Sequence, residues 1–232
     1  MKNLLKLALI FALMIAFVGC GSNDDDDDTP TPACSAADWV GVYAGPYSCT
    51  NLGGLSGTYD AIVSVSGSNV TITVKESDSD GDVFVDSYTA SPEGCTFKFS
   101  EGNEDGDEQI EATLDGNKII ITQTFVGEGS CSPATITRTS TTVPALCPSS
   151  DWIGAYTGTK TCGSNTPEAI TVDITEASFA GGLNFSIDLR SWAGAVPFGC
   201  EVPFFDSKAT LNGDNLTIEL DGGDCTVTAT RD

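Results

Sequence analysis

An acidic segment carries the side chains in this chain whose types and spacing are closest to a metal site. The segment ESDSDGD, residues 76–82, places Asp78, Asp80 and Asp82 at alternate positions, with a glycine between the last two. Carboxylates at this spacing are typical of the start of a calcium loop, where several hard oxygen ligands converge on one cation. Gly-Asp pairs are also typical of hairpin turns, and Ala90 stands near the place where such a loop closes with Glu. Calcium binding and a solvated turn are therefore both open hypotheses.

The rest of the composition excludes most catalytic chemistry. The sequence has no His, which excludes a Ser-His-Asp triad, a Cys-His pair and every metal site that needs imidazole. No glycine loop precedes a recognisable helix, so no phosphate cradle is predicted. Paired carboxylates for hydrolysis stay open, because acids abound and no pair stands out. The net charge of −23 makes nucleic acid and anionic surfaces poor partners. We therefore expect no enzyme and no nucleic-acid binding.

The beginning of the chain predicts export. Residues 1–19 combine two lysines with a short apolar run, as a secretory signal does. The junction Phe-Val-Gly-Cys, ending at Cys20, resembles the lipobox of bacterial lipoproteins, which implies lipid (palmitate among its chains) on Cys20. An odd count of nine Cys fits, since removing Cys20 leaves an even number for disulfides. Residues 20–32 then form a disordered acidic tether, similar to export tags of surface lipoproteins in some Gram-negative bacteria. We expect a lipid-anchored protein of the outer membrane or cell surface.

The remaining chain repeats itself. CSAADWVGVYAG begins at Cys34 and CPSSDWIGAYTG begins at Cys147, and each copy then carries three further Cys. Two copies of about a hundred residues are domain-sized, so we expect an internal duplication with domains at 33–141 and 145–232.

Both copies are predicted to be β throughout. Glycine-rich turns separate segments in which Val, Ile, Thr, Phe and Tyr alternate with polar residues. The first copy yields the candidate strands 39–49, 57–66, 70–76, 83–90, 95–100, 109–114, 118–126 and 131–139. Without intervening amphipathic helices the sheet should be antiparallel, and consecutive hairpins favour an up-and-down barrel, with a two-layer sandwich as the competitor. The expected fold class is all-β, with two tandem small barrels that are disulfide-stapled.

Each copy opens with Trp and closes with Arg, which is similar to lipocalin-type barrels. Trp39 and Arg138 mark the first copy, and Trp152 and Arg231 mark the second. The resemblance implies a Trp that plugs the closed end of each barrel and a basic residue on the last strand that packs over it. These two barrel-closing pairs lie at the ends of each copy, and the longer loops and helix of that family are absent.

The same arrangement implies the disulfides. If the first and last strands pair antiparallel with Trp39 near Arg138, the far end of the first strand meets the start of the last. The expected bridges are Cys49–Cys131, Cys34–Cys95, Cys162–Cys225 and Cys147–Cys200. Because turns alternate between the two rims, the acidic segments 76–82 and 101–109 should lie at the open mouth of the first barrel.

The function predicted from these features is a non-catalytic binding or structural module on a membrane anchor. Its partner is an unknown protein, glycan or small apolar ligand. A barrel cavity that carries such an apolar ligand is the alternative, although strands this short favour an interior filled by side chains. Trp192, the tryptophan outside the repeated motif, is either a contact residue or a core plug. A carboxylate-dependent hydrolase is the third hypothesis, and no cofactor other than calcium is expected.

Overall fold

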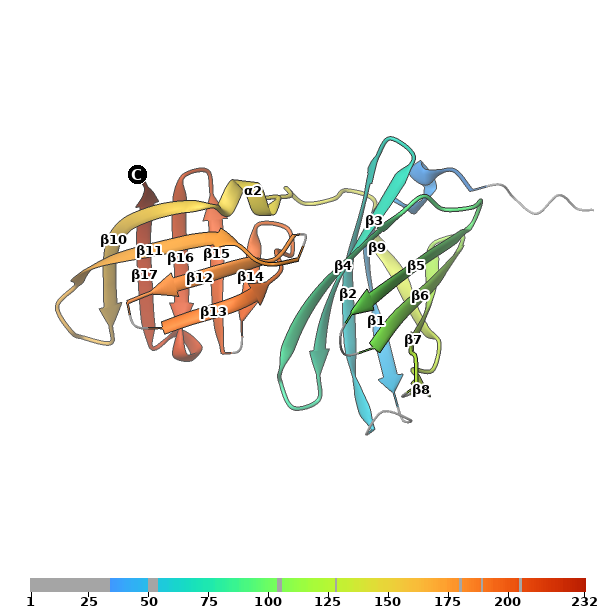
Figure 1. Cartoon of the computed structure of the whole chain (residues 1–232), viewed down its shortest axis with the longest axis horizontal. Helices are drawn as coiled ribbons and strands as arrows, with labels where there is room; N and C mark the ends of the chain where they lie inside the picture. Colours follow the sequence, from blue (N-terminus) through green and yellow to red (C-terminus); the bar gives the residue numbers. More distant parts are fainter. Residues whose placement is uncertain are drawn as a thin grey trace, which may run out of the picture. The chain divides into compact units, whose positions relative to one another are not determined.

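A computed structural model describes residues 34–49, 54–103, 106–127, 129–179, 181–188, 190–204 and 206–232. The expected signal peptide, Cys20 and the acidic tether lie outside these residues. Two antiparallel sheets make up nearly all of the described chain, as the alternating pattern predicts (Figure 1). Among the described residues no helix is both long enough and apolar enough to cross a membrane.

The first sheet follows a short 3-10 helix, η1 (Ala36–Trp39). Its strands are β1 (Gly41–Cys49), β2 (Leu55–Ser66), β3 (Asn69–Asp78), β4 (Val83–Ala90), β5 (Thr96–Asn103), β6 (Gly106–Asp115), β7 (Lys118–Phe125), β8 (Gly129–Ser130) and β9 (Ala134–Ser140).

The second sheet follows the short helix α2 (Ser149–Trp152). Its strands are β10 (Gly154–Cys162), β11 (Glu168–Glu176), β12 (Leu183–Ile187), β13 (Arg190–Ala195), β14 (Glu201–Phe204), β15 (Ser207–Asn212), β16 (Asn215–Leu220) and β17 (Cys225–Arg231); η2 (Asp221–Gly223) joins the last two.

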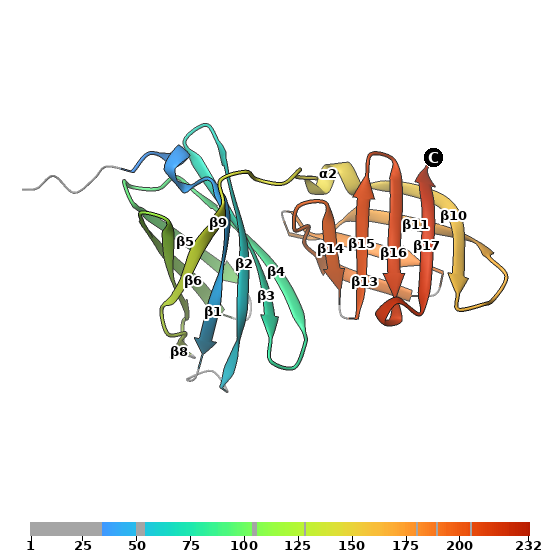
Figure 2. The same cartoon turned by 180° about the vertical axis from the view of Figure 1, so that it is seen from behind.

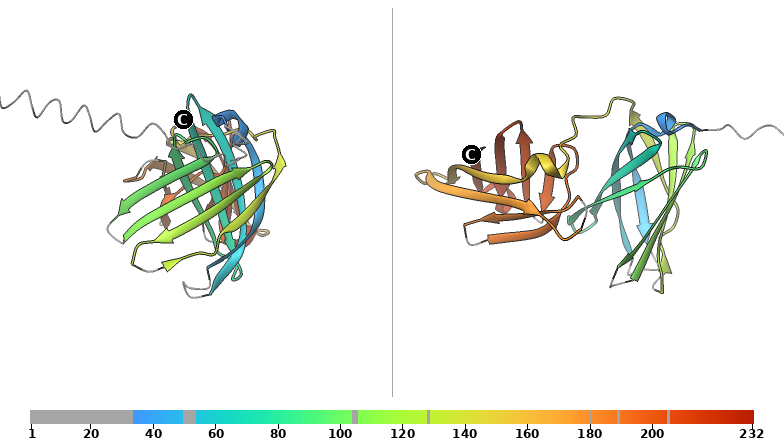
Figure 3. Two further views of the ribbon diagram at one scale, coloured as in Figure 1. Left: turned by 90° about the vertical axis from the view of Figure 1, so that its right-hand side faces the viewer. Right: turned by 45° about the horizontal axis from the view of Figure 1, so that its top comes forward.

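Each sheet is a nearly closed up-and-down barrel. The strand order is β4-β3-β2-β1-β9-β7-β6-β5 in the first and β13-β12-β11-β10-β17-β16-β15-β14 in the second. The first and last strands pair directly, so the sheet curls round on itself, as views from both sides show (Figures 1 and 2). Each barrel stays open between its fourth and fifth strands, where no ladder joins β4 to β5 or β13 to β14. Further views of the curled sheets are given in Figure 3.

The core of each barrel is the inward face of its strands. Buried and exposed residues alternate along β11 and β16, because successive side chains of a strand point to opposite faces. The barrel interiors are filled by aliphatic and aromatic side chains, with Trp39 and Trp152 fully buried. Burying each such side chain contributes about 1.5–3 kcal/mol, so these interiors stabilise both barrels.

Two local features differ from the expected strands. Trp39 belongs to η1, and the strand that was expected to start there begins at Gly41. Helix η1 carries a capping box. The backbone N–H and the hydroxyl of Ser35 both donate hydrogen bonds to the Asp38 carboxylate. The Gly-containing segment around Trp192 forms strand β13.

Candidate functional site

The last-strand arginine closes the first barrel at the end that holds Trp39. Arg138 donates from Nε to the Tyr43 hydroxyl at 2.8 Å and from its terminal nitrogen to the Asp38 carbonyl. The Tyr43 hydroxyl in turn donates to the Trp39 carbonyl at 2.8 Å. The arginine therefore ties β9 to β1 and to η1. The two hydrogen bonds that the charged guanidinium donates are stronger than hydrogen bonds from a neutral donor.

The second barrel repeats this closure residue by residue. Arg231 donates to the Tyr156 hydroxyl and to the Asp151 carbonyl, and Tyr156 donates to the Trp152 carbonyl. Each guanidinium lies over the tyrosine ring, at 5.1 Å for Arg138 and 5.4 Å for Arg231. In the described residues the ring beneath the arginine is thus a tyrosine, and the stacking on Trp39 and Trp152 that the lipocalin resemblance implies is replaced by contacts through this tyrosine.

Four disulfides join the cysteines in the pairs expected from the barrel arrangement. Cys49–Cys131 and Cys162–Cys225 link the first strand of each barrel to the start of its last-strand region, each with Cα atoms 4.0 Å apart. Cys34–Cys95 and Cys147–Cys200 link the segment before the first strand to the segment before the fifth, with Cα atoms 4.8 Å apart. Each bridge of the second pair holds the start of the fifth strand, which borders the opening of its barrel.

The residues proposed as calcium ligands form a turn instead. The Asp78 carboxylate accepts hydrogen bonds from the backbone N–H groups of Asp80 and Asp82, at 2.9 and 2.8 Å. Asp80 and Asp82 are exposed. In the part of the chain that the structure describes, no group of three or more acidic, Cys or His side chains is arranged to hold a metal ion. Of the two hypotheses for this segment, the geometry therefore fits the turn.

An unpredicted polar cluster lies inside the first barrel, at the end of β1 that carries Cys49. We call it the acid–tyrosine layer; it consists of Tyr47, Tyr59, Glu76, Tyr88, Glu108 and Gln123. Its members lie on six strands, β1, β2, β3, β4, β6 and β7, and Glu76, for example, follows the buried Val74 on the same face of β3. The alternation of each strand thus places polar groups where the apolar core ends.

Hydrogen bonds hold one side of this layer in place. Glu108 Oε1 accepts from the Tyr88 hydroxyl at 3.1 Å and from Gln123 Nε2 at 2.6 Å. Gln123 Oε1 accepts from the Tyr59 hydroxyl at 3.0 Å. The ring of Tyr59 stacks on that of Tyr47, with centroids 4.4 Å apart and planes 9° from parallel. This network fixes the positions of the Glu108 carboxylate and the two stacked rings.

The other side of the layer is electrostatically strained. Burial, together with Asp78 and Glu108, raises the pKa of Glu76, while the Tyr47 hydroxyl opposes that change. Burial and the Glu76 carboxylate raise the pKa of Tyr47. Tyr47 is only 4% exposed, and its hydroxyl has no hydrogen-bond partner within 3.5 Å among the described residues. Two inward carboxylates and a buried hydroxyl therefore share one end of the barrel.

The cavity within this layer is small. It has a volume of about 10 Å³ and is lined by Tyr59, Val74, Glu76, Asp86, Tyr88, Ile110, Ile121 and Gln123. That volume is close to the minimum for one water molecule. A cavity of this volume is too small to enclose a sugar ring. Its size is also unlike that of a carrier site for an apolar ligand.

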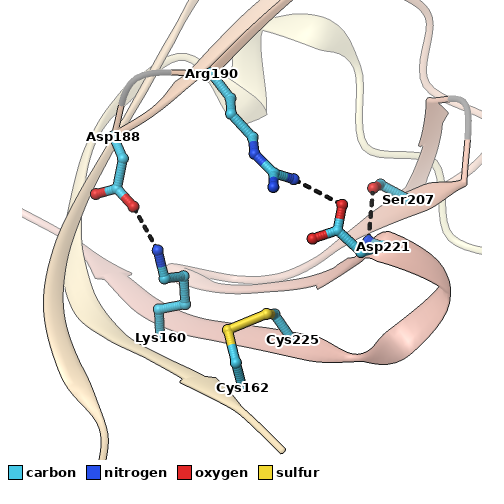
Figure 4. The surroundings of a disulfide bond; sticks show 7 residues. All are labelled: Lys160, Cys162, Asp188, Arg190, Ser207, Asp221 and Cys225. Atoms are coloured by element: carbon cyan, nitrogen blue, oxygen red, sulfur yellow. Dashed lines mark hydrogen bonds and ion pairs between the residues drawn. A yellow bond between two sulfur atoms is a disulfide. The ribbon is translucent and has the colours of Figure 1, made fainter.

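The corresponding end of the second barrel contains paired charges (Figure 4). Lys160 on β10 donates to Asp188 at 2.7 Å, and Arg190 donates to Asp221 at 2.7 Å. Both pairs lie near the Cys162–Cys225 disulfide. These basic side chains reach across the barrel mouth from different strands, so the charges at this end are compensated within the chain.

Trp192 is a partly buried core residue. It lies on β13, packs against the second hydrophobic core, and its ring is 5.1 Å from that of Phe204. Its position fits the core-plug alternative.

No protein-family model matches the sequence, and no curated protein matches it either. Among solved structures, the chain is similar to a crystal structure from Nostoc punctiforme PCC 73102, a protein of unknown function from the DUF3598 family. The two are 16% identical, with a TM-score of 0.29, over 85% of this chain and 99% of that one. A similarity at this TM-score carries no argument about the present chain, whose function is inferred below from its own residues.

A signal for the acid–tyrosine layer is present in the sequence. Alternation along the strand places Glu76 on the same face as Val70, Ile72 and Val74. It likewise places Glu108 on the face of Ile110 and Ala112. An acid at an inward position of a predicted barrel strand indicates a polar interior. Glu76 and Glu108 each belong to an acidic segment, 76–82 or 101–109, in which turn residues are the more prominent signal.

Proposed function

We propose that this chain is a lipid-anchored lipoprotein, displayed on the surface of a Gram-negative bacterium, whose two barrels act as a non-catalytic binding module. Cysteine usage is the observation that carries the proposal. The sequence contains nine Cys, and the eight that follow Cys20 are all joined in disulfides. Cys20 is the remaining thiol, at the junction that resembles a lipobox.

Two physical arguments support this reading. Disulfides persist in oxidising compartments, so four of them favour a location outside the cytoplasm. Several acyl chains on one residue give a far firmer membrane attachment than one chain does. The negative charge of the acidic segment after Cys20 repels anionic lipid headgroups, which would hold the barrels away from the membrane surface.

The non-catalytic role is supported by the contents of the barrels. The cavity in the acid–tyrosine layer has room for about one water molecule, and the described chain contains no His and no metal cluster. The carrier and hydrolase alternatives each need a larger site than this cavity offers.

The test of the anchor is metabolic labelling with an alkyne fatty acid in a Gram-negative host that expresses the full chain. We expect the wild-type protein to take up the label and to fractionate with membranes. Cys20→Ala should abolish both, because the acyl acceptor is lost. The double variant Cys49→Ala/Cys131→Ala, which removes cysteines without touching the junction, should still be labelled. Surface display is checked on intact cells by added protease, which should digest the wild-type chain.

An unlabelled wild-type protein released as a soluble chain would show that the junction is an ordinary cleaved signal. A labelled chain that stays protease-resistant until the cells are lysed would refute surface display alone.

A further inference from the structure

The two barrels pack against each other within one compact unit of the chain. Ile62 lies on the outward face of β2 and takes no part in the core of the first barrel, yet it is only 3% exposed. Residues that precede β14 in the second barrel cover this face. A Cβ on Gly199 would lie 3.7 Å from Ile62 Cδ1, and Lys75 Nζ lies 5.0 Å from the centre of the Phe198 ring. The outer face of β2 and β3 is therefore a contact surface between the barrels.

A cleft of about 520 Å³ lies between the two barrels rather than inside either of them. The first barrel contributes residues of β3, β4, β6 and β7 to its walls, and the second contributes residues of β13 and β14. Strands β4, β13 and β14 border the openings of their barrels, so the cleft lies where no ladder closes either sheet. Its volume falls within the range of roughly 300–1,000 Å³ that is typical of pockets for small organic molecules.

Aromatic side chains form much of the wall of this cleft. Phe84 and Phe125 come from the first barrel, and Trp192 and Phe204 come from the second. Phe84 is 56% exposed, more than any other large apolar side chain among the described residues. Trp192 packs on Phe204, with ring centroids 5.1 Å apart, and stays partly exposed. Exposed aromatic surface that gathers in a cleft of this size favours an organic ligand over a metal ion.

The charged residues of the cleft all have the same sign. Glu76, Asp82, Asp86 and Glu108 line it, and none of the described residues in its walls is Lys or Arg. The Glu108 carboxylate is held in place by a hydrogen bond from the Tyr88 hydroxyl at 3.1 Å. A cleft that combines charges of one sign with apolar walls concentrates the electric field, and it raises the local concentration of ligands of the opposite charge. The aromatic walls therefore select an organic ligand, and the carboxylates select a cation.

We propose that the cleft between the barrels binds a small organic cation that has an aromatic or branched apolar body. The body packs against Phe84 and Trp192, and the charged group faces Glu76 and Glu108. The aromatic faces add further attraction for the cation. Each barrel supplies part of the site, so the ligand joins the two barrels. This inference rests on the proposed binding role and names its ligand chemistry.

Titration of the full mature lipoprotein in nonionic detergent tests the proposal, with 2-phenylethylammonium chloride as the probe and with calorimetry and tryptophan emission as readouts. Trp39 and Trp152 are fully buried in the barrel cores, whereas Trp192 lines the cleft, so a change in emission reports on the cleft. We expect saturable binding by both readouts. Neutral 2-phenylethanol and anionic 3-phenylpropionate should bind about tenfold or more weakly, since they cannot donate from a charged group to the carboxylates. n-Butylammonium should also bind more weakly, because it has no ring to place against the aromatic walls.

Variants with matched controls locate the site. Phe84→Ala should weaken binding about threefold or more, and the exposure of Phe84 means that the fold does not depend on it. Ile120→Ala is its control, because Ile120 is an exposed apolar residue of the first barrel outside the cleft. Glu76→Gln should weaken binding about tenfold. Glu111→Gln, which removes an outward carboxylate that pairs with Lys98, is the control for charge.

Trp192→Phe separates the two readouts. It should abolish the emission change while calorimetry still detects binding, because phenylalanine keeps an aromatic ring in the wall. The proposal is overturned if a folded chain shows no saturable binding, if the amine and the alcohol bind equally, or if the emission change survives Trp192→Phe. Equal effects of Phe84→Ala and Ile120→Ala also overturn it.

Fatty-acid labelling at Cys20 is measured on the same preparation. A failed titration by a labelled chain refutes the ligand assignment alone, and binding by an unlabelled chain supports the ligand assignment and refutes the lipid anchor.

Discussion

Glu76 is an acid on the inward face of β3, the face that Val70, Ile72 and Val74 share. Its carboxyl is partly buried beside Asp78 and Glu108, and these surroundings raise its pKa. A residue that is unfavourable for folding at neutral pH and faces a buried hydroxyl is typical of a functional position. At the residue scale, the candidate site is thus where stability and binding make opposite demands.

Glu76→Gln should stabilise the protein increasingly as the pH rises above about 4.5, the ordinary value for this carboxyl. The folded chain binds the Glu76 proton more tightly than the unfolded chain does. Ionisation at higher pH therefore reduces the free energy of unfolding, and glutamine escapes that loss. Melting temperatures of both proteins from pH 4 to pH 8 give the measurement. A difference that shrinks with rising pH would contradict the assigned burial of Glu76.

At the element scale, the first and last strands approach closely at a glycine that both barrels share. A Cβ on Gly158 would lie 2.0 Å from the Thr228 carbonyl oxygen, and one on Gly45 would lie 2.5 Å from that of Thr135. Neither distance is possible for real atoms, so a side chain there would push the closing strand away. The glycine therefore permits the pairing that closes the barrel.

Gly158→Ala should lower the free energy of unfolding by about 1–3 kcal/mol, the usual cost of overpacking. Urea denaturation of the full chain measures this value. Thr159→Ala, on the outward face of the same strand, serves as the control and should change stability by less than about 0.5 kcal/mol. Equal effects of the two substitutions would show that β10 and β17 are not held at this distance.

The elements themselves could largely be predicted from the sequence, because turn glycines and alternation are local signals. Residues 83–90 were expected as a strand and form β4, and the expected strand 118–126 contains β7 (Lys118–Phe125). The exceptions depend on tertiary contacts. Strand β13 is stabilised by pairing with β12 and by the packing of Trp192, neither of which its Gly-containing sequence reveals. Trp39 was expected to start a strand but lies in η1. The capping hydrogen bonds of Ser35 and Asp38 favour a helical turn there over strand pairing.

The candidate site was harder to predict than the fold. The Arg138 closure could be anticipated from residue types at the two ends of the repeat, but the role of Tyr43 as the ring beneath it could not. The acid–tyrosine layer combines residues from six strands, and its hydrogen bonds join residues up to 64 positions apart. Alternation along the strand alone indicates an inward acid; only the barrel geometry shows that the Glu108 charge lies close enough to raise the pKa of Glu76.

At the scale of the whole molecule, the net negative charge lowers the free energy of unfolding and the disulfides raise it. A formal charge of −23 favours the expanded chain through self-repulsion. Each bridge restricts the unfolded chain, and a closed loop as long as that between Cys49 and Cys131 contributes about 4 kcal/mol in the chain-entropy description. The four bridges compensate for barrels that are small and strongly charged.

Raising the salt concentration from about 10 mM to about 150 mM should therefore increase the melting temperature, because the screening length falls from about 30 Å to about 8 Å. We expect a rise of a few degrees, since about 1 kcal/mol corresponds to roughly 2–4 °C in a chain of this size. Scanning calorimetry in NaCl and in KCl provides the measurement. A decrease in both salts would mean that attractive ion pairs, such as Lys160–Asp188, outweigh the repulsion.

The pairing of β1 with β9, and of β10 with β17, sets an order on assembly. Synthesis from the N-terminus makes β1 first, yet this strand lacks one neighbour until the last strand of the same barrel has been made. Loop closure over such distances is slow, so each barrel stays an unfinished sheet for most of its synthesis. Strands β1 and β10 therefore wait longest for their last neighbour, and Cys49 and Cys162 at their ends can pair correctly only after Cys131 and Cys225 have been made.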